Sequence, residues 1–300
     1  MEKAYLGIDA GGTGIKAGLI FRSGEIIFES NTPTGKNWGN EDFLNAVSSL
    51  CEKAFSVQKP EAIGIGTPGP IDIENGIILH SANMHGLKNV PLTESLKKKF
   101  SVPVCFNNDA NCAALGEYHF GAGTGSKNLL VITLGTGLGA GWVLDGKIYN
   151  GFQGNGMELG HTTVEPDSKA LCGCGQYGCI ESYFSASGLL NRYEEMTGRR
   201  LANALEFFSL VQSGDEKAGD VLEKALGYFA LTLRTAVHTV NPDRIVLVGG
   251  LAKSSDLYLE KLKKKVSQIV FPVLWNNLRL ETGKNVAGTL GAGSLCFASR

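Results

Sequence analysis

Apolar runs that end in glycine-rich turns dominate the start of the chain. Residues 4–9 and 15–21 are two such runs, separated by the turn Asp9-Ala-Gly-Gly-Thr-Gly14. A second turn, Ser23-Gly24, leads into a third run at 25–29. Short apolar runs bounded by glycine predict buried strands. We therefore expect a glycine-rich β-hairpin here, and not the strand-to-helix turn of a Walker phosphate loop.

Helical and strand-like patterns alternate along the following segment. Phe43, Val47, Leu50 and Ala54 fall on one stripe, which predicts a helix over 41–56. The other expected elements are strands at 61–66, 77–79 and 102–106 and helices at 91–100 and 110–119. This alternation predicts the α/β class.

The hairpin has a second copy later in the chain. Gly12-Thr-Gly-Ile-Lys-Ala-Gly18 and Gly135-Thr-Gly-Leu-Gly-Ala-Gly141 share the pattern G-T-G-x-x-A-G, and each follows an apolar run. Without Cβ atoms, the backbone N–H groups of such turns can close on a phosphate. The repeat therefore predicts two related halves that hold a nucleotide between them, with chance similarity of two glycine turns as the alternative. The nucleotide candidates are Gly11, Gly12, Thr13 and Lys16 in the first copy and Gly135, Thr136 and Gly137 in the second.

Helices are expected to dominate the last part of the chain. They are predicted at 186–196, 204–211, 216–240, 257–270 and 286–297, with one strand at 244–248. That strand ends in Gly249-Gly250, which could admit an adenine or ribose or could be a plain packing turn. We expect a smaller domain of residues 1–117 plus 288–300 and a larger domain of residues 118–287.

Composition narrows the class of protein. The chain has 300 residues, enough for two domains, with 43% hydrophobic residues and a formal net charge of −1. Because no basic surplus exists, nucleic acid is not an expected partner. The longest uncharged stretch, 128–144, carries alternate glycines that predict a hairpin and not a membrane span. The chain opens directly on a strand, so no signal peptide is expected, and no membrane partner is expected either. Clustered cysteines without a disulfide framework predict a reducing environment, so the expected location is cytoplasmic.

One cluster has the spacing of metal ligands. Cys172, Cys174 and Cys179 lie close together with interleaved glycines, and His161 precedes them. Three thiolates and one imidazole form the ligand set of a closed tetrahedral zinc site. Glu158 and Glu181 frame the cluster; they could be incidental, or they could face another ligand. The cysteines outside the cluster predict small core residues, Cys51, Cys105, Cys112 and Cys296.

Asp109 occupies a second position of chemical interest. It lies in Asn107-Asn-Asp-Ala-Asn111, between the strand expected at 102–106 and the helix at 110–119. Ligand-handling residues gather at such strand ends in open α/β sheets. An aspartate there can equally cap the helix, and the two roles are compatible.

These motifs together resemble the ROK family of bacterial sugar kinases over the whole chain. The motifs that carry the resemblance are Asp9-Ala-Gly-Gly-Thr13, Asn108-Asp109-Ala-Asn111, Leu134-Gly-Thr-Gly137, Glu158-Leu-Gly-His161, the run from Cys172 to Glu181, and Asn241-Pro242. The resemblance implies the two-domain fold of actin and hexokinase (ribonuclease H-like), with nucleotide and sugar bound in a cleft between domains. It also implies ATP and Mg²⁺, a structural Zn²⁺, and a homodimer.

The resemblance also implies residue roles. Asp109 is expected to be the general base, and Asp9 to organise Mg²⁺ through water. The sugar hydroxyls are expected to bind Asn83, Asn108, Asp109, Glu158, His161 and Glu181, and the nucleotide to bind Gly12, Thr13, Thr136 and Gly250. One nitrogen of His161 is expected to bind zinc with Cys172, Cys174 and Cys179, while the other donates to the sugar.

Two residues depart from the usual family pattern. Leu87 stands where tryptophan is common, and Met157 stands where glycine is usual. The expected activity is ATP-dependent phosphorylation of a hexose, with glucose, giving glucose 6-phosphate, as the first choice. N-acetylmannosamine, N-acetylglucosamine, fructose, allose and β-glucosides remain alternative substrates. A sugar-sensing protein without catalysis is the non-enzyme alternative.

Overall fold

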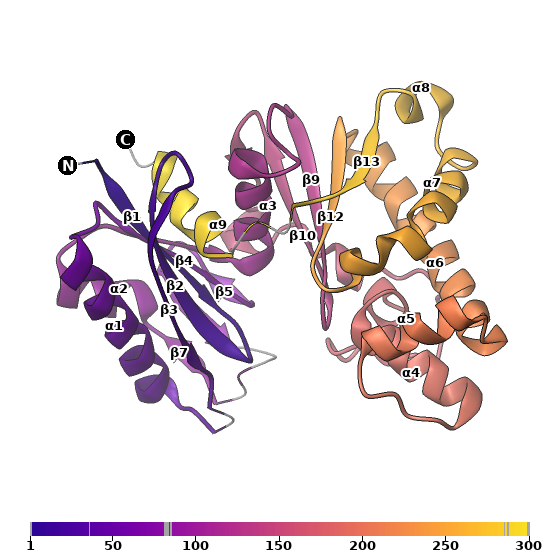
Figure 1. The fold of residues 1–300 in the computed structure, drawn as a ribbon, viewed down its shortest axis with the longest axis horizontal. Helices are drawn as coiled ribbons and strands as arrows, with labels where there is room; N and C mark the ends of the chain where they lie inside the picture. The colour runs from indigo at the N-terminus through magenta and orange to yellow at the C-terminus, as the bar shows by residue number, and fades with distance from the viewer. Residues whose placement is uncertain are drawn as a thin grey trace. The chain divides into compact units, whose positions relative to one another are not determined.

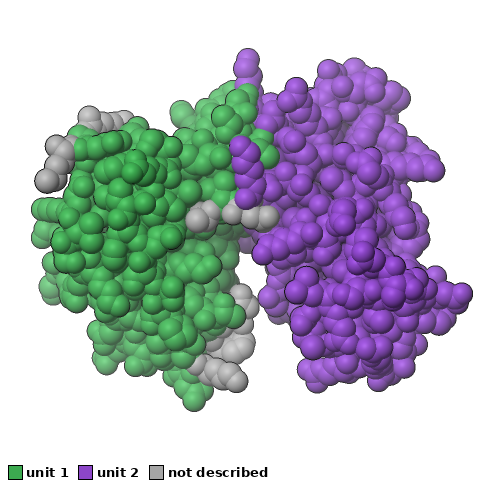
Figure 2. Space-filling model, viewed as in Figure 1, with its two compact units in different colours: residues 1–125, 141–157, 286–300 green, residues 126–140, 158–285 purple. Residues whose placement is uncertain are grey.

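The computed structural model describes residues 2–35, 37–80, 84, 86–284, 286 and 288–298. The chain forms two compact units (Figure 2). The first unit contains residues 1–125, 141–157 and 286–300, and the second contains residues 126–140 and 158–285. From the sequence we expected residues 118–125 and 141–157 in the larger domain. In the structure they belong to the first unit.

A five-stranded sheet forms the centre of the first unit (Figure 1). Its strand order is β3-β2-β1-β4-β8. The strands are β1 (Ala4–Ala10), β2 (Gly14–Phe21), β3 (Ile26–Pro33), β4 (Ile63–Thr67) and β8 (Val104–Asn108). The first three strands pair antiparallel, and β4 and β8 continue the sheet in parallel with β1.

The alternation of side chains along β1 buries both faces of this sheet. Leu6 and Ile8 are fully buried in a core with residues of α1 (Asn40–Val57). On the other face, Gly7 leaves room for α9 (Gly288–Ser294), because a Cβ atom there would lie 1.8 Å from the carbonyl oxygen of Thr289. The helix and sheet backbones therefore touch directly at this point. The remaining helices of the unit are α2 (Leu92–Phe100) and α3 (Asp109–Phe120).

The second sheet repeats the topology of the first. Its strand order is β11-β10-β9-β12-β13, the same order with corresponding strands. The strands are β9 (Asn128–Leu134), β10 (Leu138–Leu144), β11 (Lys147–Ile148), β12 (Arg244–Val248) and β13 (Arg279–Thr282). Both glycine-rich turns thus connect the equivalent strands of two related sheets, which confirms the predicted repeat.

Helices complete the second unit. They are α4 (Ala186–Thr197), α5 (Ala204–Ser213), α6 (Glu216–Val240), α7 (Leu259–Ser267) and α8 (Pro272–Trp275). Their apolar stripes meet in an aromatic core in which Phe184 stacks on Phe229 at 4.5 Å between ring centroids. None of the helices in the described ranges is long and apolar enough to cross a membrane.

Most expected elements are present, and the differences are local. The long helix at 216–240 has the predicted bounds. The expected helix at 286–297 is shorter, because α9 ends at Ser294 and a 3₁₀ turn (Leu295–Ala298) follows. β13 was not predicted. A small three-stranded sheet, β5 (Ile71–Asp72), β6 (Ile77–His80) and β7 (Lys88–Val90), includes the short strand expected at 77–79.

Asp243 joins the strands of the second sheet. The hydroxyl of Ser126 and the N–H groups of Lys127 and Asn128 donate to its carboxylate at 2.6, 2.8 and 2.9 Å. Its own carbonyl accepts the N–H of Arg279 at 3.0 Å. Burial alone would raise the pKa of Asp243, but these donors, with Arg244 nearby, hold it below its ordinary value.

We expect Asp243→Asn to destabilise the protein by about 2 kcal/mol at pH 7, since a charged acceptor of three donors is replaced by a weaker one. Because the folded pKa is lowered, the carboxylate stabilises the fold above its unfolded pKa of about 3.9, and this contribution is lost as the pH falls through the folded value. Urea unfolding at pH 7 and pH 3.5 should show the gap between variant and wild type narrowing in acid. A constant gap would contradict this account.

Candidate active site and metal centre

The carboxyl ends of three strands meet at one edge of the first sheet. The register pairs Asp9 of β1 with Gly66 of β4, and Gly66 with Asn107 of β8. Asp9, Gly66 and Asn107 therefore form one row at this edge, and Asp109 follows immediately. This is the edge at which open α/β sheets bind ligands.

Asp109 is the first residue of α3 and is exposed. The N-cap of α3 is Asn108, whose side-chain oxygen accepts the N–H of Ala110 at 2.8 Å. Asp109 also accepts this N–H at 2.8 Å through Oδ1. The cap position that the sequence left open to Asp109 therefore belongs to Asn108. Burial and the nearby carboxylates of Asp109 and Asp9 all raise the pKa of the Cys112 thiol, which places both acids near one buried group.

Asp9 lies against the start of α9. A Cβ atom on Gly288 would come within 2.2 Å of its Oδ2, so a larger residue there would have to displace the Asp9 carboxylate. Burial raises the pKa of Asp9, and Lys16, opposite it on β2, partly offsets this effect. A carboxylate at a ligand-binding edge is a suitable Mg²⁺ ligand, directly or through water.

Both glycine-rich turns are held by hydrogen bonds from neighbouring segments. In the first, Gly11 donates to the carbonyl of Gly14 at 3.0 Å, and Thr34 Oγ1 donates to the carbonyl of Gly11 at 2.9 Å. In the second, Gly135 donates to the carbonyl of Gly137 at 3.0 Å, and Ala186 donates to the carbonyl of Gly135 at 2.9 Å. Gly249, with φ of 99°, packs against Leu134, so that two of the predicted nucleotide segments lie together in the second unit.

An asparagine network supports the edge of the first sheet. The Asn107 amide donates to Asn150 Oδ1 at 2.9 Å and accepts from the amide of Asn111 at 2.8 Å. Asn155 exchanges two hydrogen bonds with the backbone of Ile71, at 3.2 and 2.9 Å. Segment 150–155 is therefore fixed to the rest of the first unit at two points. Sequence reasoning missed this network; its only signal was asparagine within the glycine-rich segment Asn150-Gly-Phe-Gln-Gly-Asn155.

The four predicted metal ligands come together in the second unit. One ligand atom from each of His161, Cys172, Cys174 and Cys179 lies within 4.8 Å of all the others. The sulfurs of Cys174 and Cys179 are 3.7 Å apart, and the Cys172 sulfur is 3.5 Å from His161 Nδ1. Tetrahedral zinc imposes roughly 3.8 Å between two sulfur ligands and roughly 3.5 Å between sulfur and nitrogen. The residues therefore fit a zinc ion.

The two acids that frame the cluster have different surroundings. Glu158 Oε2 is 3.9 Å from His161 Nε2, the ring nitrogen that faces away from the cysteines. Burial raises the pKa of Glu158; His161 lowers it and Glu181 raises it, both to a smaller extent. The Glu181 carboxylate contacts the Cys172 sulfur at 3.3 Å and accepts the N–H of Leu138 at 2.9 Å. Glu181 thus links the cysteine cluster to the second glycine-rich turn, a contact that sequence reasoning missed.

Gly160 explains why the motif Glu158-Leu-Gly-His161 needs its glycine. A Cβ atom there would lie 2.0 Å from the carbonyl oxygen of Leu138. Met157, where the family usually has glycine, has φ of 59°, a left-handed conformation that favours glycine. Leu87, the other departure, is buried in the core. Asn83 lies outside the described residues.

Glu117 was not among the predicted functional residues, although it contacts two segments where the chain passes between the two units. The chain first leaves the first unit after Gly125, and it returns to that unit for the last time at Val286. The Glu117 side chain, 1% exposed, accepts the N–H of Ala122 at 2.8 Å and that of Val286 at 3.2 Å. One carboxylate on α3 therefore holds two of the segments that lie next to the boundaries between the units.

We expect Glu117→Gln to lower the free energy of unfolding by about 2–3 kcal/mol, because the amide nitrogen would face one buried N–H donor and leave it without an acceptor. Urea unfolding measures the loss. Glu25→Gln, at an exposed glutamate, is the control and should change stability by less than about 0.5 kcal/mol. Equal stability of the two variants would contradict the expected role of Glu117.

Comparison with known proteins agrees with this architecture. The ROK family model matches residues 5–298. A glucokinase of Halalkalibacterium halodurans is 34% identical over 98% of this chain and 95% of its own length. The crystal structure of a ROK hexokinase from Thermus thermophilus has a TM-score of 0.86 and 33% identity, covering 99% of this chain and 98% of that one. A Streptomyces griseus ROK glucokinase in complex with glucose and AMPPNP has a TM-score of 0.81 and 29% identity, covering 97% and 98%.

The paired sheets and the likeness to ROK hexokinase structures define a two-domain α/β protein with the actin/hexokinase-like fold, as the resemblance implied. The chain belongs to the ROK family. Its relatives also include an N-acetyl-D-glucosamine kinase at 35% identity and a xylose repressor at 31%.

Proposed function

We propose that this chain is an ATP-dependent sugar kinase that transfers the γ-phosphoryl group of ATP to a hexose hydroxyl, with glucose as the first candidate and glucose 6-phosphate as its product. The observation that carries the proposal is the exposed carboxylate of Asp109 at the carboxyl end of β8, next to the row that contains Asp9. Relatives described as glucokinases support the choice of substrate.

The proposed chemistry assigns one proton transfer to the protein. Asp109 accepts the proton of the attacking sugar hydroxyl while the hydroxyl oxygen bonds to the γ-phosphorus of ATP. The bond between the γ-phosphorus and the bridging oxygen of the β-phosphate breaks, which releases ADP. The turns at Gly11–Thr13 and Gly135–Gly137, with Lys16, hold the phosphates, and Gly249 and Gly250 hold the nucleoside. Mg²⁺ would neutralise phosphate charge when bound, with Asp9 as its ligand through water.

The proposed sugar contacts are Asn83, Asn108, Glu158, His161 and Glu181. Amide and carboxylate groups suit a polyol because they donate to or accept from hydroxyls in a fixed geometry. His161 would bind zinc through Nδ1, leaving Nε2 on the side of Glu158. Because four protein ligands close the coordination shell, zinc would be structural and would not act as a Lewis acid.

A coupled assay with ATP, Mg²⁺ and a panel of hexoses tests the activity. The panel contains glucose, N-acetylglucosamine, N-acetylmannosamine, fructose, allose and a β-glucoside. We expect ADP production to be fastest with glucose. Sugar binding without ADP production would favour a sugar sensor. This alternative is supported by the xylose repressor among the relatives. We also propose that the chain forms the homodimer that the resemblance implies. We propose no nucleic-acid partner and no membrane partner.

A further inference from the structure

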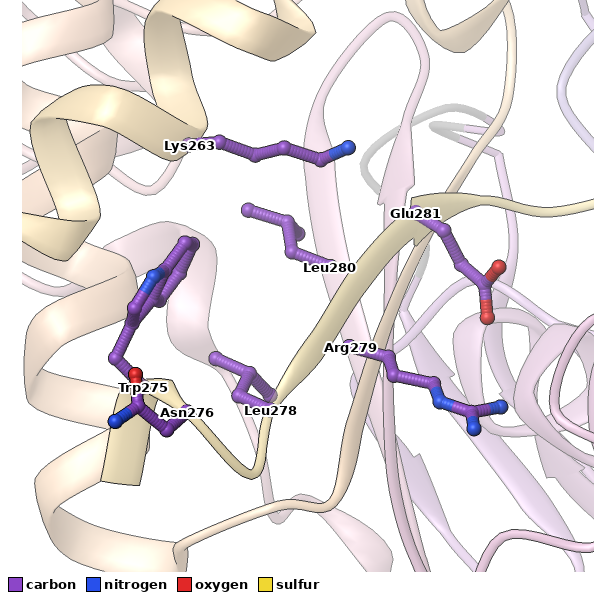
Figure 3. A pocket seen from close by; sticks show the side chains of 7 residues that line it. All are labelled: Lys263, Trp275, Asn276, Leu278, Arg279, Leu280 and Glu281. Carbon is purple, nitrogen blue, oxygen red and sulfur yellow. The ribbon is translucent and has the colours of Figure 1, made fainter. Parts of the chain in front are cut away.

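The thiols outside the metal centre all belong to the first unit. Cys105 lies on β8, Cys112 on α3, and Cys296 on the 3₁₀ turn that follows α9. From the sequence we expected them as separate core residues, but the fold brings Cys105 and Cys296 together. In the second unit, the cavity of about 480 Å³ beside β13 is lined without any thiol, by Lys263, Trp275, Asn276 and residues 278–281 (Figure 3).

The strand register places Cys105 and Cys296 on the same side of the first sheet. Gly64 of β4 pairs with Cys105 of β8 in parallel, so their side-chain directions coincide. A Cβ atom on Gly64 would lie 3.2 Å from the Cys296 sulfur and 1.9 Å from the carbonyl oxygen of Ala292 in α9. Glycine at this position therefore lets the C-terminal segment approach the sheet, and it leaves the Cys296 sulfur beside the Cys105 side chain.

Contacts of Phe297 hold the C-terminal turn in place independently of the thiols. Arg22 Nη2 donates to the carbonyl of Phe297 at 2.9 Å, and the guanidinium lies 5.1 Å from the centroid of the Phe297 ring. The same ring packs edge-on against Tyr5 at 5.2 Å between centroids. The neighbouring Cys296 belongs to the small core that contains Tyr5, and Cys105 packs against that core. The two thiols are therefore already close together in the resting structure.

The two thiols differ in accessibility and in ionisation. Cys105 is half-buried, whereas Cys296 is buried. A hydrogen bond with Cys105 and, to a smaller extent, burial raise the pKa of the Cys296 thiol well above its ordinary value. A hydrogen bond has this effect when the thiol is the donor, so the S–H of Cys296 points to the Cys105 sulfur. Cys105 is therefore the thiol that a dissolved reagent reaches first, and Cys296 is placed to react second.

We propose that Cys105 is a thiol-modification site for low-molecular-weight disulfides, and that Cys296 converts the mixed disulfide into an intramolecular one. The Cys105 thiolate attacks one sulfur of the reagent, whose S–S bond breaks, and the departing half takes up the proton that Cys105 lost. The Cys296 thiolate then attacks the Cys105 sulfur and releases the second half as a thiol. Two protein thiols are oxidised while one small disulfide is reduced to two thiols, and an excess of small thiols reverses the reaction.

The new bond would staple the C-terminal turn to the central sheet. A cross-link stabilises a fold mainly by restricting the unfolded chain, and the effect grows with the length of the closed loop. The loop between Cys105 and Cys296 contains the whole second unit. α9 directly precedes the turn and begins against Asp9, so the staple would secure the helix behind the proposed active-site edge. The inference does not depend on kinase activity.

Peptide mapping after oxidation tests the pairing. The purified full chain is incubated with glutathione disulfide, alkylated with iodoacetamide, and cut with trypsin and with a protease that cleaves before aspartate. These cuts separate Cys105, in residues 100–108, from Cys112, and they release Cys296 in residues 285–300. We expect mass spectrometry to find these two peptides joined by a bond that dithiothreitol breaks.

Thermal unfolding of the same samples tests the staple. We expect the treatment to raise the Tm of the wild type by about 5 °C more than that of Cys105→Ser, which cannot form the bond. Both proteins carry the same metal cluster, so oxidation of its cysteines affects them alike. Cys51→Ala, which removes another thiol of the first unit, is the control and should form the bond as the wild type does.

Each outcome decides the proposal. Cys105 found only as its glutathione adduct, or Cys296 joined to Cys112, would overturn it, as would loss of the bond in Cys51→Ala. An equal response of Tm in the wild type and Cys105→Ser would overturn the staple. Cys105→Ser changes a half-buried position, and it is used in place of Cys296→Ser, which would bury a hydroxyl. Neither ATP nor sugar enters these measurements, so failure of the proposed kinase activity would leave their result unchanged.

Discussion

Asp109→Asn should reduce the turnover of hexose by at least about 100-fold while leaving sugar affinity and stability nearly unchanged. The asparagine retains an oxygen that can accept the N–H of Ala110, and Asn108 continues to cap α3, so the fold has little reason to change. The amide cannot take the proton of the attacking hydroxyl, and removal of a positioned base typically costs two to four orders of magnitude. Turnover from the coupled assay and sugar affinity from calorimetry separate the two effects.

A matched aspartate distinguishes loss of the base from loss of a charge. Asp256→Asn removes an exposed carboxylate in the second unit, and we expect its turnover to equal that of the wild type. Asp109→Glu keeps a carboxylate but moves it by one methylene, so activity between that of the wild type and Asp109→Asn is expected. Near-normal turnover in Asp109→Asn would remove Asp109 from the reaction, even if the chain proved to be a kinase.

The fold could be predicted where local patterns agree with tertiary packing. The G-T-G-x-x-A-G repeat marks a strand–turn–strand unit in each half, and the structure shows equivalent sheets around both copies. The long apolar stripe of α6 ends just before Asn241-Pro242. Proline has no N–H to donate and its ring clashes with the preceding turn, so it marks the end of the helix. β13 was missed because a strand of four residues carries too little periodicity, and its pairing partner lies far away in sequence.

The sequence predicted which residues the candidate site contains better than it predicted the contacts that these residues form. The metal cluster follows from side-chain chemistry, because few other roles require three clustered cysteines and a histidine. The contact between Glu181 and the N–H of Leu138 joins residues 43 positions apart, and no local pattern encodes it. The choice between Asn108 and Asp109 as helix cap was likewise open, since both side chains can cap; the extended backbone of Asn108 decides it.

Cys174→Ala should weaken sugar binding and thermal stability strongly, while nucleotide affinity falls less. The change leaves three ligands around the proposed zinc, and a structural zinc site contributes directly to folding. We expect Tm to fall on the order of 10 °C, because loss of a metal site belongs to the largest class of single-residue effects. His161 belongs to this cluster and Glu158 lies beside it, so disorder there should reach the proposed sugar contacts first.

The contacts of Glu181 give the experiment a second variant. Cys174 is exposed and its sulfur lies next to that of Cys179, whereas the Cys172 sulfur contacts Glu181, which holds Leu138 of the second glycine-rich turn. Cys172→Ala should therefore weaken nucleotide binding more than Cys174→Ala does, and Tyr177→Ala, in the same loop but outside the ligand set, should bind one zinc per chain as the wild type does. Metal analysis, with separate titrations of sugar and nucleotide, measures all three. If Cys174→Ala lost nucleotide affinity while sugar affinity held, the cluster would support the nucleotide site, and Glu181 would be the residue through which it acts.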